Sequence, residues 1–303
     1  MTFKTSSKSL ISTGEPFLWG SNDTTTTPSN ETKITASDGA TGDRFGYTVA
    51  VGSGRICVGA YADDDNASTT GSAYIFDLDG TQLAKITASD SALSDRFGWS
   101  VAVKCGRIVV GTPYDDDNGS NSGSAYIFDL DGTQLAKIKP SDGAASDYFG
   151  FSVAVGSGRI VVGAYGDDNA SSGDLAGSAY IFDLDGTQLA KITAADVSDA
   201  FDLFGRSVAV GSGRICVGAY GDGDNGSNSG SAYIFDLDGT QLAKITASDG
   251  ATSNFFGVST AVGSGRIVVS AHIDDDNGPF SGSAYIYETP KVYTPYDLKY
   301  NEI

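Results

Sequence analysis

The sequence predicts an all-β fold built from five similar repeat units, and three observations support this. The dipeptide Phe-Gly recurs at spacings of 52, 52, 55 and 52 residues. Each repeat unit holds the same short alternating and β-branched runs, which are typical of strands. No stretch shows the apolar spacing of an amphipathic helix. The five dipeptides begin at Phe45, Phe97, Phe149, Phe204 and Phe256.

The first repeat unit shows the order of elements that the others follow. Alternating and β-branched runs predict four strands, over residues 47–51, 55–61, 72–76 and 81–87. Gly52-Ser53-Gly54 predicts a tight hairpin between the first two strands. Asp79-Gly80 predicts a two-residue hairpin with positive φ at both central positions. The repeat unit is therefore expected to be an antiparallel meander, with one long acidic loop between its second and third strands.

Four-stranded units with a period of about 50 residues are typical of propeller blades. The last copy lacks the fourth strand, and residues 32–38 match residues 84–90. We therefore expect a five-bladed β-propeller of four-stranded antiparallel blades, with the ring closed by an N-terminal strand. A parallel solenoid is the alternative. The expected boundaries are an N-terminal arm at 1–30, the propeller at 31–290 and a C-terminal tail at 291–303.

Composition excludes several functional classes. The formal net charge of -19 and the pI near 4.1 disfavour nucleic acid and anionic membranes as partners. No apolar stretch has the length of about 20 residues that a membrane span needs, and no signal peptide is apparent, so a cytoplasmic or virion-associated protein is expected. Cys57 and Cys216 replace a valine of other copies and Cys105 lies in a turn, which is not the pattern of a disulfide framework.

Three sequence elements resemble the FG-GAP repeat of integrin α-chain propellers and of many bacterial and viral proteins. They are Asp-Arg-Phe-Gly with Val-Ala-Val after it, Val-Gly-Ala-Tyr, and Gly-Ser-Ala-Tyr-Ile-Phe. The resemblance covers residues 31–290 and implies a propeller. Calcium-binding members carry Asp-x-Asp-x-Asp-Gly between the first two strands, where this chain has Gly-Ser-Gly or Lys104-Cys105-Gly106. That calcium site is therefore not transferred.

A meander places every acidic loop and every link between repeat units on one face. Carboxylates crowded there repel one another unless a cation or salt screens them, and calcium takes six to eight oxygen ligands. Calcium at these loops is one hypothesis, and solvated or turn-forming aspartates are the alternative. The candidate ligands are Asp63, Asp64, Asp65, Asp115, Asp116, Asp117, Asp167, Asp168, Asp222, Asp224, Asp274, Asp275 and Asp276.

Aromatic residues directly before these loops are candidate binding residues, because an aromatic side chain beside carboxylates suits glycan or peptide recognition. They are Tyr61, Tyr114, Tyr165 and Tyr220, with His272 in the fifth copy. Tyr74 and its equivalents lie within strands, where alternation favours packing between blades.

Repetition favours a non-enzymatic recognition or structural role. Near-identical repeat units create near-identical environments, whereas acid and base groups of an enzyme need different ones. We expect no catalytic residue, a glycan or protein surface as partner, and a place on a virion as a capsid decoration or tail attachment protein whose terminal arms bind other virion proteins. The alternative is a carbohydrate-active enzyme, a glycosidase or lyase, that uses carboxylates of the acidic face.

Overall fold

The computed structural model describes residues 31–65, 67–168, 175–195 and 201–290. The chain divides into two parts, Met1–Lys33 and Ile34–Ile303, and every element described below lies in the second part. The described residues include no helix of the length and apolarity needed to cross a bilayer.

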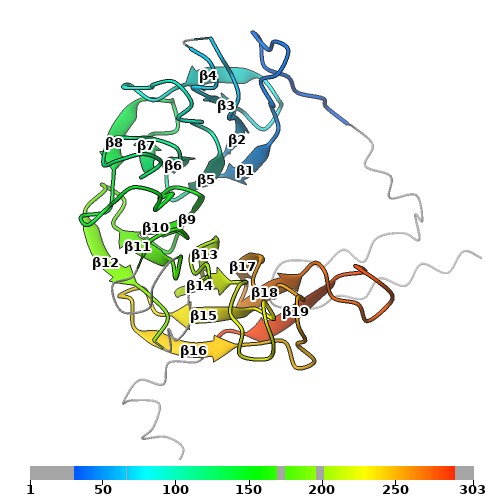
Figure 1. Cartoon of the computed structure of the whole chain (residues 1–303). Helices are drawn as coiled ribbons and strands as arrows, with labels where there is room; N and C mark the ends of the chain where they lie inside the picture. Colours follow the sequence, from blue (N-terminus) through cyan, green and yellow to red (C-terminus); the bar gives the residue numbers. More distant parts are fainter. Residues whose placement is uncertain (1–30, 66, 169–174, 196–200, 291–303) are drawn as a thin grey trace, which may run out of the picture. The chain divides into compact units, whose positions relative to one another are not determined.

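The described strands form five antiparallel sheets in which each strand pairs with its neighbour in sequence (Figure 1). The first four sheets have four strands and the last has three. The strands are β1 (Thr48–Gly52), β2 (Arg55–Ala60), β3 (Ser72–Phe76), β4 (Gln82–Ile86), β5 (Ser100–Lys104), β6 (Arg107–Thr112), β7 (Ser124–Phe128), β8 (Gln134–Ile138), β9 (Ser152–Gly156), β10 (Arg159–Ala164), β11 (Ser178–Phe182), β12 (Gln188–Ile192), β13 (Ser207–Gly211), β14 (Arg214–Ala219), β15 (Ser231–Phe235), β16 (Gln241–Ile245), β17 (Ser259–Gly263), β18 (Arg266–Ala271) and β19 (Ser283–Glu288).

The four strands predicted for the first repeat unit are confirmed to within one residue at each end. The tight hairpin between β1 and β2 is also confirmed, because Gly52 pairs with Arg55. Both central residues of that turn have positive φ, 50° at Ser53 and 75° at Gly54, which is the geometry that matches the twist of the flanking strands.

The turn between β3 and β4 differs from its prediction. Only Gly80 has positive φ there, 86°, and the strand register shifts so that Phe76 opposes Gln82. The Asp77 carboxylate accepts hydrogen bonds from the amides of Asp79 (3.0 Å) and Thr81 (2.8 Å). A capping aspartate therefore shapes a longer turn, and the predicted two-residue hairpin is wrong.

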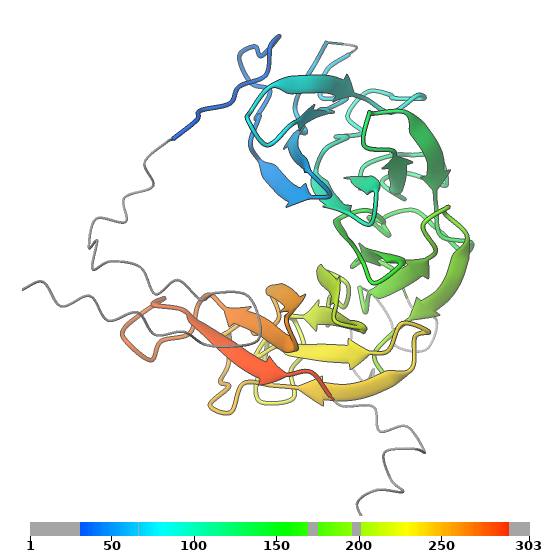
Figure 2. The ribbon, with the colours of Figure 1, turned by 180° about the vertical axis from the view of Figure 1, so that it is seen from behind.

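The apolar core of the molecule lies between neighbouring sheets. The first strand of each sheet contacts the first strand of the next, so that β1, β5, β9, β13 and β17 follow one another (Figure 2). Ile75 of the first sheet packs in one cluster with Val101 and Val103 of the second. Each of the three interior sheets thus buries one face against the sheet before it and one against the sheet after it, as propeller blades do.

The Phe-Gly dipeptide forms the junction between successive sheets. Phe97 is fully buried, with its ring edge-on to Tyr126 (centroids 5.5 Å apart) and Phe128 (5.9 Å). Gly98 has φ of +86°, and a Cβ at that position would lie 2.3 Å from the carbonyl oxygen of Ser72 in the preceding sheet. The glycine is required both by the backbone conformation and by the close approach of two backbones.

The two ends of the array differ from its interior. The last sheet has three strands, which confirms that the fifth copy lacks its fourth. Residues 31–36 form no strand, and the side chains of Ile34 and Ala36 pack on the cluster around Phe45 and Tyr74. Five sheets of this kind agree with a five-bladed propeller. Closure of the ring by an N-terminal strand stays a prediction.

We expect Gly98→Ala to destabilise the protein by about 3 kcal/mol or more, because the added Cβ meets backbone and the residue must hold positive φ. The matched control is Gly106→Ala, where φ is +73° and a Cβ would meet nothing within 4 Å; it should cost only about 1 kcal/mol. Urea unfolding of both variants measures the difference, and equal costs would show that the junction is not tightly packed.

Candidate functional site

One aspartate near the start of each acidic loop is buried. Its side chain is part of the loop's scaffold, because the Asp63 carboxylate accepts hydrogen bonds from the amide of Asp65 (3.2 Å) and the hydroxyl of Tyr74 (2.8 Å). The following residues, Asp64 and Asp65, are exposed. The five buried aspartates, each 2 to 6% exposed, are Asp63, Asp115, Asp167, Asp222 and Asp274.

In the four complete repeat units, a lysine of the fourth strand neutralises the carboxylates around the acidic loop. In the second repeat unit the Lys137 ammonium lies 2.7 Å from Asp90, 2.9 Å from Asp115 and 2.6 Å from Asp117. The hydroxyl of Tyr126 lies between two of these carboxylates, 2.7 Å from Asp90 and 3.3 Å from Asp115. One ammonium therefore joins the link between repeat units to the acidic loop.

The same cluster recurs in the other complete repeat units. Lys85 binds Asp38 (2.7 Å) and Asp63 (3.0 Å) and also pairs with Asp65. The equivalent contacts are Lys191 with Asp142 and Asp167 at 2.7 and 2.8 Å, and Lys244 with Asp222 and Asp224 at 2.9 and 2.5 Å. We call each of these a lysine cluster.

The clusters shift the ionisation of their members. Burial opposes ionisation of Asp90, but the hydrogen bonds from Lys137 and Tyr126 outweigh it, so the pKa of that carboxyl falls below its usual value. Lys137 lowers the pKa of Asp117 in the same way, against a smaller effect of burial. Burial disfavours the charged form of Lys137 itself, yet the three carboxylates raise its pKa. Asp90, Asp117 and Lys137 therefore stay ionised at neutral pH.

The fifth repeat unit has the carboxylates of this cluster without its lysine strand. The Tyr285 hydroxyl contacts Asp249 and Asp274, at 2.8 Å each. Repulsion from Asp274 and then Asp249 raises the pKa of Asp276. No lysine among the described residues pairs with Asp274, because the fourth strand that carries it elsewhere is missing from this sheet.

The structure brings four of the five buried members of the predicted calcium ligands, Asp63, Asp115, Asp167 and Asp222, together with lysines. Across the described residues, no group of three or more His, Cys, Asp or Glu side chains is arranged to hold a metal ion. An ammonium supplies the positive charge that the calcium hypothesis assigned to a metal. Calcium binding at these loops stays a prediction.

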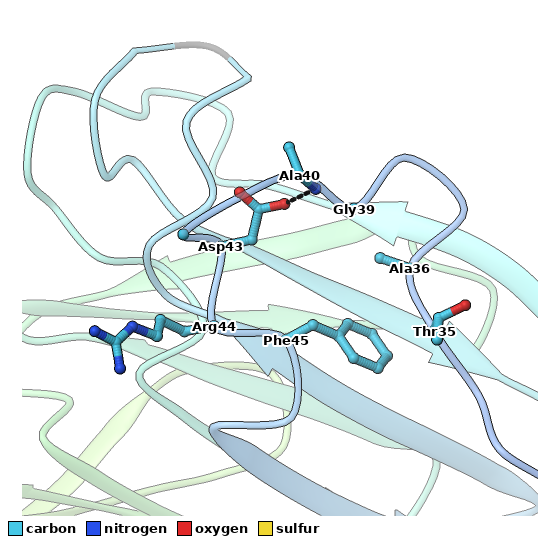
Figure 3. A pocket seen from close by; sticks show the side chains of 8 residues that line it. Thr35, Ala36, Gly39, Ala40, Asp43, Arg44 and Phe45 are labelled. Atoms are coloured by element: carbon cyan, nitrogen blue, oxygen red, sulfur yellow. Dashed lines mark hydrogen bonds between the residues drawn. The ribbon is translucent and has the colours of Figure 1, made fainter.

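Hollows lie beside the links between repeat units. The hollow of the first unit, about 610 Å³, is lined by residues such as Thr35, Gly39, Asp43 and Phe45. Asp43 Oδ2 accepts a hydrogen bond from the amide of Ala40 at 2.6 Å (Figure 3). The second and third units repeat this carboxylate-to-amide contact in their own hollows, with Asp95 to Ala92 (2.6 Å) and Asp147 to Ala144 (2.7 Å).

Two of these link carboxyls, Asp95 and Asp147, have pKa values raised by burial. Burial raises the pKa of Asp95 to about 6, although the hydrogen bond from Ala92 acts in the opposite direction. Burial also raises the pKa of Asp147 to about 6, against the hydrogen bond from Ala144. In the fifth unit Asn254 takes this place and is 7% exposed, so a neutral amide fits the position.

The predicted binding residues lie in a row made of two groups of rings. Tyr61 contacts Tyr47 (4.5 Å between centroids) and Trp99 (5.1 Å), and Trp99 contacts Tyr114 (5.5 Å). Further ring contacts extend this first group to Tyr165. The second group runs from Tyr220 to Phe255 and ends at His272, 6.0 Å from Phe255. We define the aromatic row as Tyr47, Tyr61, Trp99, Tyr114, Tyr148, Phe151, Tyr165, Tyr220, Phe255 and His272.

Two arginines lie over the row and connect it. The Arg96 guanidinium is 4.1 Å from the ring centroid of Tyr114 and 5.9 Å from that of Tyr61. The Arg206 guanidinium is 4.0 Å from Phe151 and 6.0 Å from Tyr220, which bridges the third and fourth units. Cation–π contacts of this kind stabilise an exposed aromatic surface.

Only part of the aromatic row was predicted from the sequence, namely the residues that follow the second strand of each repeat unit. Other members of the row were not predicted: Trp99 and Phe151, which directly follow Phe-Gly, and Tyr148 and Phe255, which directly precede Phe. The usable signal was that these two positions carry aromatic residues or arginine in several repeat units.

We expect Lys137→Met to destabilise the protein by about 2 to 4 kcal/mol, because it leaves three carboxylates facing one another without their ammonium. Lys139→Met is the matched control on the same strand end. Its ammonium contacts only Asp117 among the described acidic residues, at 3.2 Å, and is half-exposed, so its loss should cost less than about 1 kcal/mol. Chemical unfolding at low salt compares the two variants, and similar costs would contradict the role given to the lysine cluster.

We expect Asp95→Asn to stabilise the protein at neutral pH. The Asp95 carboxyl has a pKa of about 6 in the folded protein, so it ionises at lower pH in the unfolded chain than in the folded one. The folded protein therefore loses stability as the pH rises from about 4 to about 6. The asparagine does not titrate. The variant should therefore be more stable than wild type by the full amount above pH 6, and the difference should disappear near pH 4. Thermal melts across this range measure the gain in stability, with the exposed loop residue Asp64 changed to Asn as the control. An advantage that does not vary with pH would contradict the assignment.

A family model described as the FG-GAP repeat matches the chain five times, over residues 28–76, 81–128, 133–182, 187–235 and 240–287. No curated protein is significantly similar to the chain. The five matches cover most of the sequence. The first contains β1 to β3, and each later match contains the fourth strand of one sheet and the three strands that begin the next. The chain belongs to the FG-GAP repeat family.

Proposed function

We propose that this protein is a non-enzymatic recognition module that binds a glycan along its aromatic row. The observation that carries the proposal is the run of rings from Tyr47 in the first repeat unit to Tyr165 in the third, which Arg206 bridges to the rings of Tyr220, Phe255 and His272. Most of its rings are half-buried, so they are held in place while part of each ring faces solvent. Rigid aromatic side chains with polar tips are efficient binding groups.

The chemistry of the row suits an uncharged, repeating polymer. Burial, followed by the neighbouring Tyr148 hydroxyl, raises the pKa of Tyr165 to about 12. Burial also raises the pKa of Tyr47. These hydroxyls therefore remain neutral, and they can both donate and accept hydrogen bonds. Similar rings in successive units match the successive residues of a glycan chain, and weak contacts then add along it. The net charge of -19 disfavours anionic glycans.

Three features favour binding over catalysis. The carboxylates of the lysine clusters are engaged by ammonium and phenol groups. The hollows of the second and third units repeat the same acidic lining, so neither is a single cleft whose residues break the repeat. His272 is stacked beside Phe255 at the end of the row. The glycosidase or lyase alternative has no comparable support.

We retain the virion hypothesis within this proposal. Many copies of a glycan-binding module on a particle would turn weak single contacts into firm attachment. Its support is fold-level analogy. The arms expected to bind other virion proteins, at 1–30 and 291–303, lie outside the described residues.

The test is a screen of neutral glycans followed by fluorescence titration of Trp99. Trp19→Phe leaves Trp99 as the single tryptophan of the chain, so quenching on binding would report directly on the row. We expect Tyr114→Ala to weaken binding at least tenfold, a loss of about 1.4 kcal/mol. Leu83→Ala, an exposed position on β4, should leave the affinity unchanged.

Two results would contradict the proposal. One is a screen in which no neutral glycan binds. The other is a glycan whose affinity is the same for the Tyr114 and Leu83 variants, because its binding site would then lie elsewhere. Hydrolysis or elimination of a bound glycan would instead establish the enzyme alternative.

A further inference from the structure

The two arginines over the aromatic row lack the oxygen partners that other arginines of the chain have. Within the part of the chain that the structure describes, the side chains of Arg96 and Arg206 make no hydrogen bond and no ion pair. They contact rings instead, at 4.1 Å from the centroid of Tyr114 and 4.0 Å from that of Phe151. The arginines that donate to a carboxylate or a carbonyl are Arg55, Arg107, Arg159, Arg214 and Arg266.

A shortage of carboxylates does not explain this difference. The chain has 38 acidic residues and only 19 lysines and arginines. Asp95 directly precedes Arg96, yet its carboxylate accepts a hydrogen bond from the amide of Ala92 at 2.6 Å. A guanidinium has five N–H donors, and a cation–π contact satisfies none of them. Arg96 and Arg206 are half-buried, so their donors remain available to a ligand that lies on the row.

The two guanidiniums are close to different rings of one contacting pair. The rings of Trp99 and Phe151 lie 5.4 Å apart between centroids. Arg96 is 5.8 Å from the Trp99 ring, and Arg206 is 4.0 Å from the Phe151 ring. Trp99, Phe151 and Arg206 all directly follow Phe-Gly in their repeat units. The fourth unit therefore places a positive charge where the earlier units place a ring.

Both positive charges also act on the hydroxyl of Tyr47. Burial, followed by the neighbouring Tyr61, raises the pKa of Tyr47, whereas Arg206 and Arg96 lower it. Tyrosine hydroxyls can donate hydrogen bonds to an anion, as guanidiniums do. The surface beside these rings therefore combines positive charge with neutral hydrogen-bond donors.

We infer that Arg96 and Arg206 each bind a carboxylate of the glycan, with neutral sugars stacked on Trp99 and Phe151 between them. A carboxylate matches the guanidinium in charge and in geometry, because two parallel N–H···O bonds can form. This inference rests on the proposed function and narrows its ligand to a mainly neutral glycan with well-separated acidic sugars. The net charge of -19 still opposes a densely charged polymer, but salt screens that repulsion beyond about 8 Å.

Iodide quenching of Trp99 tests for anion attraction without a glycan. The measurement uses the Trp19→Phe protein, and the neutral quencher acrylamide corrects for exposure of the ring. We expect Arg96→Met to lower the ratio of iodide to acrylamide quenching constants about twofold or more, because a positive charge near the ring is lost. An unchanged ratio would overturn the inference.

Arg44→Met is the matched control for this substitution. Arg44 also directly precedes Phe-Gly, and its φ of 63° is close to the 59° of Arg96. Among the described residues, however, its guanidinium lies over no ring of the row. The quenching ratio of this variant should equal that of the Trp19→Phe protein.

A pair of oligosaccharides then tests the carboxylates themselves. One carries two uronic acid residues separated by neutral sugars, and the other is the same compound with both carboxyls reduced to alcohols. We expect the acidic form to bind at least tenfold more tightly, a difference of about 1.4 kcal/mol. Arg206→Met should remove most of this preference and leave the affinity for the reduced form unchanged, whereas Arg44→Met should keep the preference.

The outcomes separate this inference from the proposed function. Equal affinity for the two forms would overturn the inference and leave neutral-glycan binding intact. Binding of neither form would overturn both. A preference for the acidic form that survives in Arg96→Met and in Arg206→Met would place the carboxylates elsewhere, and it would also overturn the inference.

Discussion

The structure depends on the neutralisation of crowded carboxylates by one lysine in each complete repeat unit. Asp115 is buried 2.9 Å from the Lys137 ammonium, and an unpaired charge there would be costly. Tyr126 connects this cluster to the core, because its hydroxyl meets Asp90 while its ring contacts Phe97 of the Phe-Gly junction. The same tyrosine side chain therefore contacts both the lysine cluster and the apolar core, and this arrangement recurs in the complete repeat units.

This use of the carboxylates determines which surface is left for a ligand. The acidic loops look like a ligand face in the sequence, yet their buried members serve the scaffold. The aromatic row begins where the second strands end, at residues such as Tyr61 and Tyr114, directly before those loops. The lysine clusters hold the loops in place. The rings beside these loops are therefore held in place as well, which lowers the entropic cost of binding a ligand.

The strands and the first hairpin could be predicted because their signals are local. Alternation and Gly-Ser-Gly identify β1 and β2 within a few residues. The turn after β3 could not, because Asp77 caps it through its side chain and shifts the register. The lysine clusters were missed for a different reason: Lys85 is 47 residues from Asp38 and 20 from Asp65, so only the folded sheet brings them together. The aromatic row could be predicted only in part. Tyr61 recurs as the same residue type at its position in other repeat units. Trp99 and Arg206 occupy equivalent positions but differ in residue type.

The most direct measurement of this account is a pair of thermal melts, one in EDTA and one in millimolar calcium. If lysines neutralise the acidic loops, the two midpoints should agree within about 1 °C, because no site gains a ligand. A metal ion present at 100 times its dissociation constant would stabilise the folded state by about 2.7 kcal/mol for each site that it occupies. A rise of several degrees in calcium, with several ions bound per chain by calorimetry, would contradict the claim that ammonium groups alone balance this face.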